Sequence, residues 1–133
     1  MGNTLTTCVY CGCGCGLYLQ ESDGRITGAI PSLHHPVSRG NLCVKGWHIH
    51  EFIHSSERLT QPLIRKNGVL TPTTWDEALS FTAREFGRIR DQTAASGVGV
   101  LSSAKCTNEE NYLLQKFTRA VLKTNNIDHC ARL

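Results

Sequence analysis

Four of the seven cysteines in this chain lie within eight residues, CVYCGCGC at positions 8 to 15. Cys8, Cys11 and Cys15 have the spacing C-x2-C-x3-C, and Cys43 follows after 27 intervening residues. A cubane iron–sulfur cluster needs four thiolates, one on each iron atom. A short loop can supply three of them and a distant residue the fourth, so the spacing favours a cluster.

Zinc is the alternative metal. Zinc accepts mixed cysteine and histidine ligands, and one possible set is Cys8, Cys11, Cys43 and His48, with His50 as another candidate for the last position. This set leaves the spacing of Cys15 unexplained. A zinc site would indicate a structural or interaction domain, whereas a cluster would indicate electron transfer.

Cys13 is separated from Cys11 and from Cys15 by one residue each. In an extended loop its side chain is expected to point away from theirs, which predicts a packed or free thiol and not a ligand. A loop that approaches a cluster closely needs residues that tolerate positive φ angles. Glycines supply this freedom here, at Gly12, Gly14 and Gly16.

Two hairpins and two helices are predicted in the chain beyond the cysteine-rich segment. LYLQESDGRITGAI, residues 17 to 30, alternates around an Asp23-Gly24 turn, and LTQPLIRKNGVLTPT turns at Asn67-Gly68. A first helix begins at Thr74 with Glu77 completing a capping box, and a second begins at Thr107 with Glu110. Apolar residues recur at helical spacing in both helices: Trp75, Leu79, Phe86 and Ile89 in the first, Leu113, Phe117, Ala120 and Val121 in the second.

A short apolar stretch, VGVLSS at residues 98 to 103, lies between the two helices and is predicted to be a buried strand. A strand between helices indicates an α/β layer with a parallel sheet. The predicted fold class is therefore α+β and α/β. A small β-rich domain is expected over residues 1–58, followed over residues 59–133 by the beginning of an α/β domain.

Composition excludes several classes of protein. The formal charge of +3, without a basic run, does not indicate a nucleic-acid partner. No stretch approaches the roughly 20 apolar residues of a membrane span. The first residues, MGNTLTTCVY, lack the basic start and apolar core of a secretory signal, so a cytoplasmic location is expected. In that compartment, seven cysteines indicate metal ligands and free thiols.

The motifs resemble one known family. CVYCGCGCGL and HPVSRGNLCVKG are similar to the N-terminal iron–sulfur domain of molybdenum or tungsten bis(molybdopterin guanine dinucleotide) oxidoreductases. GWHIHEFIHSSERLTQPLIRKNG and TWDEAL continue the similarity. SSAKCTNEENYLLQKFTRAVLKTNNIDHCARL resembles the catalytic (alpha) subunits of formate dehydrogenases. Cys13 departs from the pattern, because the family usually has threonine, valine or another small residue there.

The resemblance implies specific roles for individual residues. Cys8, Cys11, Cys15 and Cys43 would bind one [4Fe-4S] cluster, and Lys45 would lie between cluster and pterin as an electron relay. A positive charge two residues from a ligand would stabilise the added electron and donate hydrogen bonds. Residues at the start of the second helix are further candidates for pterin binding, because helix N-termini suit phosphate groups. These are Cys106, Thr107 and Asn108.

The resemblance also implies the wider function. The expected activity is formate and carbon dioxide interconversion at a molybdenum or tungsten centre, with the cluster relaying electrons and this piece inactive by itself. The expected partners are the remainder of the catalytic subunit and an iron–sulfur electron-transfer subunit, or a hydrogenase or NAD-linked partner. A stand-alone ferredoxin-like electron-transfer module is the alternative, beside the zinc domain.

The chain ends at Leu133. In the family, a cysteine or selenocysteine that binds the metal follows directly after this segment. The sequence is therefore expected either to be a fragment or to stop at a UGA codon that the organism reads as selenocysteine, and the second is favoured.

Overall fold

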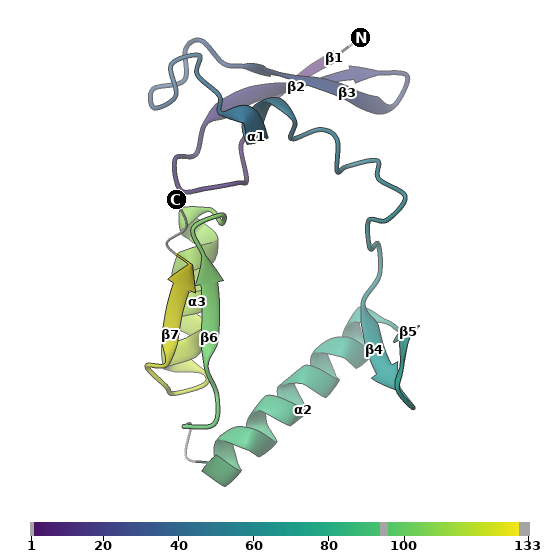
Figure 1. Cartoon of the computed structure of the whole chain (residues 1–133), viewed down its shortest axis with the longest axis vertical. Helices are drawn as coiled ribbons and strands as arrows, with labels where there is room; N and C mark the ends of the chain where they lie inside the picture. Colours follow the sequence, from purple (N-terminus) through teal and green to yellow (C-terminus); the bar gives the residue numbers. More distant parts are fainter. Residues whose placement is uncertain (1, 94–95, 131–133) are drawn as a thin grey trace. The chain divides into compact units, whose positions relative to one another are not determined.

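The computed structural model describes residues 2–93 and 96–130 (Figure 1). Its contacts divide the chain into two compact units. The first contains the chain up to Arg58, the segment Ser102–Tyr112 and the described residues after Asp128, and the second contains Leu59–Leu101 and Leu113–Asp128. The expected metal-ligand position follows residues 131–133, which lie outside the described residues. The domain boundary expected after residue 58 stays a prediction.

An antiparallel sheet in the order β1-β2-β3 forms the centre of the first unit, with β1 at Gly2–Thr7, β2 at Gly16–Ser22 and β3 at Arg25–Pro31. The hairpin predicted at Asp23-Gly24 is confirmed, and both turn residues have positive φ angles of 51° and 73°. β1 was not predicted, because its three threonines and exposed Leu5 give only a weak alternating pattern.

A short helix, α1 at Val44–Trp47, follows the sheet along the chain. Its neighbour Ile49 joins Cys8, Leu17 and Ala29 in a small buried cluster. Tyr10 and Phe52 pack against this cluster from the outside, with their rings edge to face at 6.3 Å. The core of the first unit therefore lies directly beneath the cysteine-rich segment, and Cys8 is part of it.

The remaining elements confirm the second hairpin and both helices. They are β4 at Leu63–Lys66, β5 at Val69–Pro72, α2 at Trp75–Thr93, β6 at Val100–Ser103, α3 at Asn108–Ala120 and β7 at Ile127–Cys130. β6 and β7 form a two-stranded sheet, and Figure 1 draws their arrows pointing the same way. The bonds from Val100 N–H to Asn126 O (2.8 Å) and from Ala104 N–H to Cys130 O (3.3 Å) follow the same direction. The strand–helix–strand unit is thus parallel, which confirms the predicted fold class.

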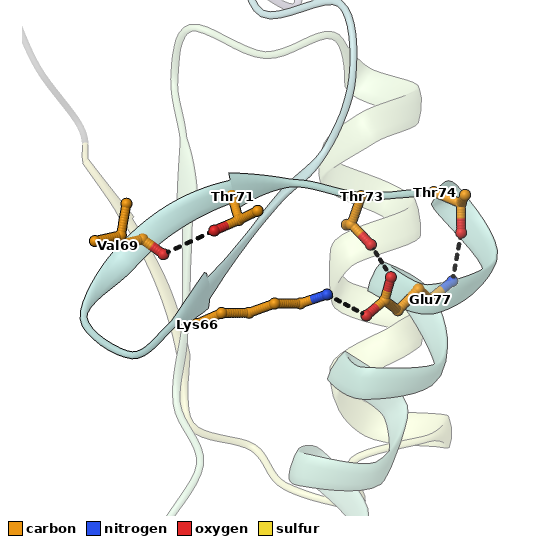
Figure 2. A network of polar contacts seen from close by, with 6 residues as sticks. All are labelled: Lys66, Val69, Thr71, Thr73, Thr74 and Glu77. Atoms are coloured by element: carbon orange, nitrogen blue, oxygen red, sulfur yellow. Dashed lines mark hydrogen bonds and ion pairs between the residues drawn. The ribbon is translucent and has the colours of Figure 1, made fainter.

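The two capping boxes differ. At α3 both halves form, because Glu110 N–H donates to Thr107 Oγ1 (3.2 Å) and Thr107 N–H donates to the Glu110 carboxylate (2.7 Å). At α2 Glu77 N–H donates to Thr74 Oγ1 (3.2 Å), but the Glu77 carboxylate instead accepts from Thr73 and from Lys66 Nζ (Figure 2). An ammonium group from the preceding hairpin competes for this carboxylate, so the predicted box is only half formed.

The apolar faces predicted for α2 and α3 are present, but their side chains are largely exposed to solvent. Every residue of α2 is described and none is buried; Leu79 is 61% exposed, and Phe117 of α3 is 38% exposed. Within the second unit these side chains border an apolar cavity of about 310 Å³, and the rings of Phe86 and Phe117 meet edge to face at 6.3 Å. The helical periodicity of both segments is confirmed. The burial predicted for the strand between the helices was wrong, because no residue of β6 is buried and Leu101 is 85% exposed.

Among the described residues, no helix is both long enough and apolar enough to cross a membrane.

Candidate iron–sulfur site

The cysteine-rich segment is the loop that joins β1 to β2. The last pair of the ladder is Thr7 with Gly16, and Cys8 N–H extends it by donating to Cys15 O at 2.8 Å. Within the loop, Gly14 N–H donates to Cys11 O (3.3 Å), and Gly14 has a φ of 60°. The first and last cysteines of the motif are therefore fixed opposite each other by the strands, and a turn carries the two between them.

Cys13 does not point away from its neighbours. Its Sγ lies 3.5 Å from the Sγ of Cys15, so the orientation predicted from sequence was wrong. Residues two apart in an extended segment share a face, and the left-handed backbone at Gly14 tightens the turn between them. Cys13 is exposed.

A turn at residues 32–41 anchors the chain before Cys43. Ser32 N–H donates to Gly16 O (3.0 Å), and Gly16 N–H donates to the Ser38 hydroxyl (3.2 Å). The ring of His35 lies against Gly16 so closely that a Cβ there would be 2.6 Å from its Cγ. His35 Nδ1 also accepts from Ser38 N–H at 3.2 Å. This network fixes the turn at residues 32–41, which precedes Cys43, against Gly16, which follows Cys15.

Cys43 is the N-cap residue of α1. The backbone N–H of Gly46, followed by the N–H and the ammonium charge of Lys45, lowers the pKa of the Cys43 thiol against the opposing effect of partial burial. A lowered pKa favours the thiolate, which is the form that binds metals. Lys45 itself is exposed and borders an open hollow of about 270 Å³ together with Tyr10 and Glu51.

Cys15 has the opposite electrostatics. Burial, then the thiol of Cys13, and then the charges of Cys8 and Cys11 raise the pKa of Cys15 to about 11. Several thiolates in one loop repel one another, so protons or a cationic centre must compensate them. An iron–sulfur cluster supplies that compensation, and an all-thiol donor set suits it. All seven cysteines lie in the described residues and all are free thiols, so the donor chemistry fits.

The structure does not assemble either predicted metal site completely. Among residues 2–93 and 96–130, no three cysteine, histidine, aspartate or glutamate side chains are grouped closely enough to hold a metal ion. His48, the candidate zinc ligand, is exposed and its Nδ1 pairs with Glu51 at 2.6 Å. His50 Nδ1 is buried and lacks a hydrogen-bond partner in the described part of the chain.

The three candidates at the start of α3 have different surroundings. Thr107 is occupied by the capping box, and Cys106 is half-buried. Asn108 reaches the cysteine loop, where its amide donates to Gly12 O at 3.0 Å. The expected pterin contacts of these residues stay predictions. The contact between Asn108 and Gly12 could not be found from sequence, because 96 positions separate the two residues.

An antiparallel sheet that carries a cysteine-rich loop, followed along the chain by a parallel strand–helix–strand unit, is the arrangement expected of an iron–sulfur protein joined to an α/β segment. Comparison with known families makes this specific. Residues 1–55 match the molybdopterin oxidoreductase Fe4S4 domain, and residues 58–133 match the family described as molybdopterin oxidoreductase. The chain belongs to the molybdopterin oxidoreductase family. These matches indicate a [4Fe-4S] cluster and a molybdenum or tungsten pterin cofactor, and they confirm the resemblance seen in the sequence.

Three similar proteins are subunits of formate dehydrogenases. The chain is 52% identical over 128 residues to the alpha subunit of an F420-dependent formate dehydrogenase of Methanocaldococcus jannaschii. It is 52% and 51% identical to the alpha subunits of F420-dependent formate dehydrogenases 1 and 2 of Methanococcus maripaludis. Each match covers 96% of this chain and 18% of the relative. The chain thus spans less than a fifth of the length of these relatives.

Proposed function

We propose that this chain is the electron-exit part of a formate dehydrogenase catalytic subunit. Cys8, Cys11, Cys15 and Cys43 hold one [4Fe-4S] cluster. The observation that carries the proposal is the placement of three of these thiols in the β1–β2 loop, with the approach to the fourth anchored at Gly16. When bound, the cluster accepts and passes on single electrons.

Lys45 serves as the relay between cluster and pterin. Lys45 is two residues from Cys43 in the chain, and after the N–H of Gly46 its own N–H and its charge help to lower the pKa of the Cys43 thiol. The positive charge of an ammonium group favours the reduced, more negative state of a neighbouring redox centre. Replacing Lys45 by alanine should slow electron transfer while leaving the cluster in place.

The reaction of the complete protein is the interconversion of formate and carbon dioxide. The similarity to formate dehydrogenase alpha subunits across 96% of the chain supports this substrate. Because the chain spans only 18% of the relative's length, we expect the remainder of the catalytic subunit to be needed for turnover, and the 133 residues alone should not oxidise formate. A partner subunit in the cytoplasm accepts the electrons, and the relatives' names make F420 the first acceptor to test, before iron–sulfur or NAD-linked partners.

The test uses the intact protein, purified without oxygen from its host. We expect about four iron atoms per site, visible absorption, and an EPR signal on reduction, whereas a zinc domain would be silent in both spectra. Cys11→Ser and Cys43→Ser should each abolish the signal. Cys130→Ser, at an exposed cysteine of β7, is the matched control and should retain it.

Two further results separate the alternatives. Cys15→Ser should abolish a cluster but would spare a zinc site made by the other three positions and His48. Formate turnover that disappears when the host is starved of molybdate and tungstate distinguishes the enzyme from a stand-alone electron-transfer module. Zinc in place of iron would overturn the cluster, and iron without formate turnover would overturn the proposed substrate.

A further inference from the structure

The start of α3 is attached to the cysteine loop by one side chain. Asn108, the first residue of α3, donates a hydrogen bond from its amide nitrogen to the carbonyl oxygen of Gly12 at 3.0 Å. Gly12 lies between Cys11 and Cys13, and both ends of the bond belong to the first unit. A residue far along the chain therefore holds the peptide at the centre of the loop.

Close packing accompanies this hydrogen bond. A Cβ built on Gly12 would collide with Oδ1 of Asn108 and lie 3.1 Å from its Cγ. The Asn108 side chain thus lies directly against the Gly12 backbone, where any larger residue would displace it. Gly12 is needed for space and not for a left-handed backbone, since its φ is not among the positive ones.

Asn108 is itself held in place. The capping box of Thr107 and Glu110 fixes the first turn of α3. The amide of Asn111 adds bonds to Ser103 O and Thr107 O, both at 3.2 Å. The helix start is therefore a firm support, and the loop is the partner that would move if the contact were lost.

We propose that Asn108 is a positioning residue for the iron–sulfur cluster, a role that rests on the proposed function of the four cysteines. Because a trans peptide is planar, a carbonyl held on one side fixes the N–H on the other side. The bond at Gly12 O thus fixes the direction of the Cys13 N–H. Amide N–H groups around a cluster set its reduction potential and its retention, so Asn108 acts on both through the loop.

The experiment compares variants of the intact, cluster-loaded protein by two measurements. The midpoint potential is taken from the EPR signal in a redox titration, and iron release is followed with a chelator. Asn108→Ala should shift the potential to more negative values and speed iron release about twofold, the effect of a hydrogen bond at the weak end of the usual range, because this bond is exposed. Asn3→Ala, on exposed β1, is the matched control and should change neither.

Two more variants separate positioning from helix stability. Asn108→Asp keeps the shape of the side chain and places a favourable charge in the first turn of α3, but it cannot donate to Gly12 O. It should release iron as fast as Asn108→Ala. Gly12→Ala should displace Asn108, so the double variant Gly12→Ala with Asn108→Ala should be no worse than Gly12→Ala alone.

The outcomes distinguish the inference from the function on which it rests. A wild-type protein without a cluster overturns the proposed function. A wild-type cluster whose potential and release rate are unchanged by Asn108→Ala overturns the positioning role alone. Fully additive losses in the double variant would also overturn it, because additivity means that the two residues act independently.

Discussion

Ser38→Ala is the substitution that best tests how the approach to Cys43 is held. Ser38 is 6% exposed, and its hydroxyl accepts the N–H of Gly16 at 3.2 Å. The same hydroxyl lies 3.2 Å from Nδ1 of His35. Alanine removes the acceptor but leaves the backbone N–H of Gly16 buried at the end of β2.

The magnitude follows from that unpaired N–H. Leaving one buried donor unsatisfied costs about 1–3 kcal/mol, whereas removing an exposed hydrogen bond costs much less. Local opening of the turn at residues 32–41 should therefore become about 5- to 150-fold more frequent. Leu17, fully buried beside Gly16, should hold the rest of β2 in place, so the effect should be local.

Hydrogen exchange of the intact protein, read by mass spectrometry on peptides that cover residues 14–22 and 32–43, measures this opening directly. Ser22→Ala is the control, because its hydroxyl bonds only the exposed carboxylate of Asp23 among the contacts described. Exchange should rise in both peptides for Ser38→Ala and stay within twofold for the control. Equal exchange in the two variants would refute the anchoring role of Ser38.

Two other predictions concern the turn before Cys43 and the start of α2. Gly40→Ala should open the same turn, because Gly40 has a φ of 82° and a Cβ would lie 2.8 Å from Leu33 Cδ2; unchanged exchange over residues 32–43 would contradict this. Lys66, followed by Thr73, lowers the pKa of Glu77. The stabilisation of the hairpin–helix junction is then complete at neutral pH and is lost as pH falls through the lowered pKa. Exchange over residues 63–80, corrected for intrinsic rates, should rise at acid pH, and Glu77→Gln should remove that dependence.

Local signals allowed much of the fold to be predicted. The two hairpins have Asp-Gly and Asn-Gly turns, whose residues adopt the positive φ angles that such turns require. The helices have N-cap threonines, and the strand between them was correctly placed. The weakly alternating β1 was missed, as was β7, which is only four residues long and mostly exposed. Each missed strand is defined by its partner more than by its own residues.

The candidate site was less predictable for a different reason. The spacing of cysteines indicated a cluster, but it contained no information on what holds the loop. Ser38 and Asn108 are ordinary turn and helix-start residues in sequence, and only the folded chain brings them to Gly16 and Gly12. The orientation predicted for Cys13 was wrong because side chains two residues apart in an extended segment point to the same face, and the prediction had placed Cys13 and Cys15 on opposite faces.

The contacts of Asn108 with Gly12 and of Ser38 with Gly16 restrain a loop that is flexible by composition. A segment with glycine at positions 12, 14 and 16 loses more conformational entropy on ordering than the same segment with other residues at these positions would. Its own hydrogen bonds, Cys8 to Cys15 and Gly14 to Cys11, constrain the ends and one turn but not the central peptide. Asn108 holds that peptide, and Ser38 fixes the segment that precedes Cys43. A loop that is already restrained loses less conformational entropy when it binds a cluster. Loss of either contact should therefore weaken cluster retention even though neither residue is a ligand, whereas loss of an exposed thiol such as Cys130 should not.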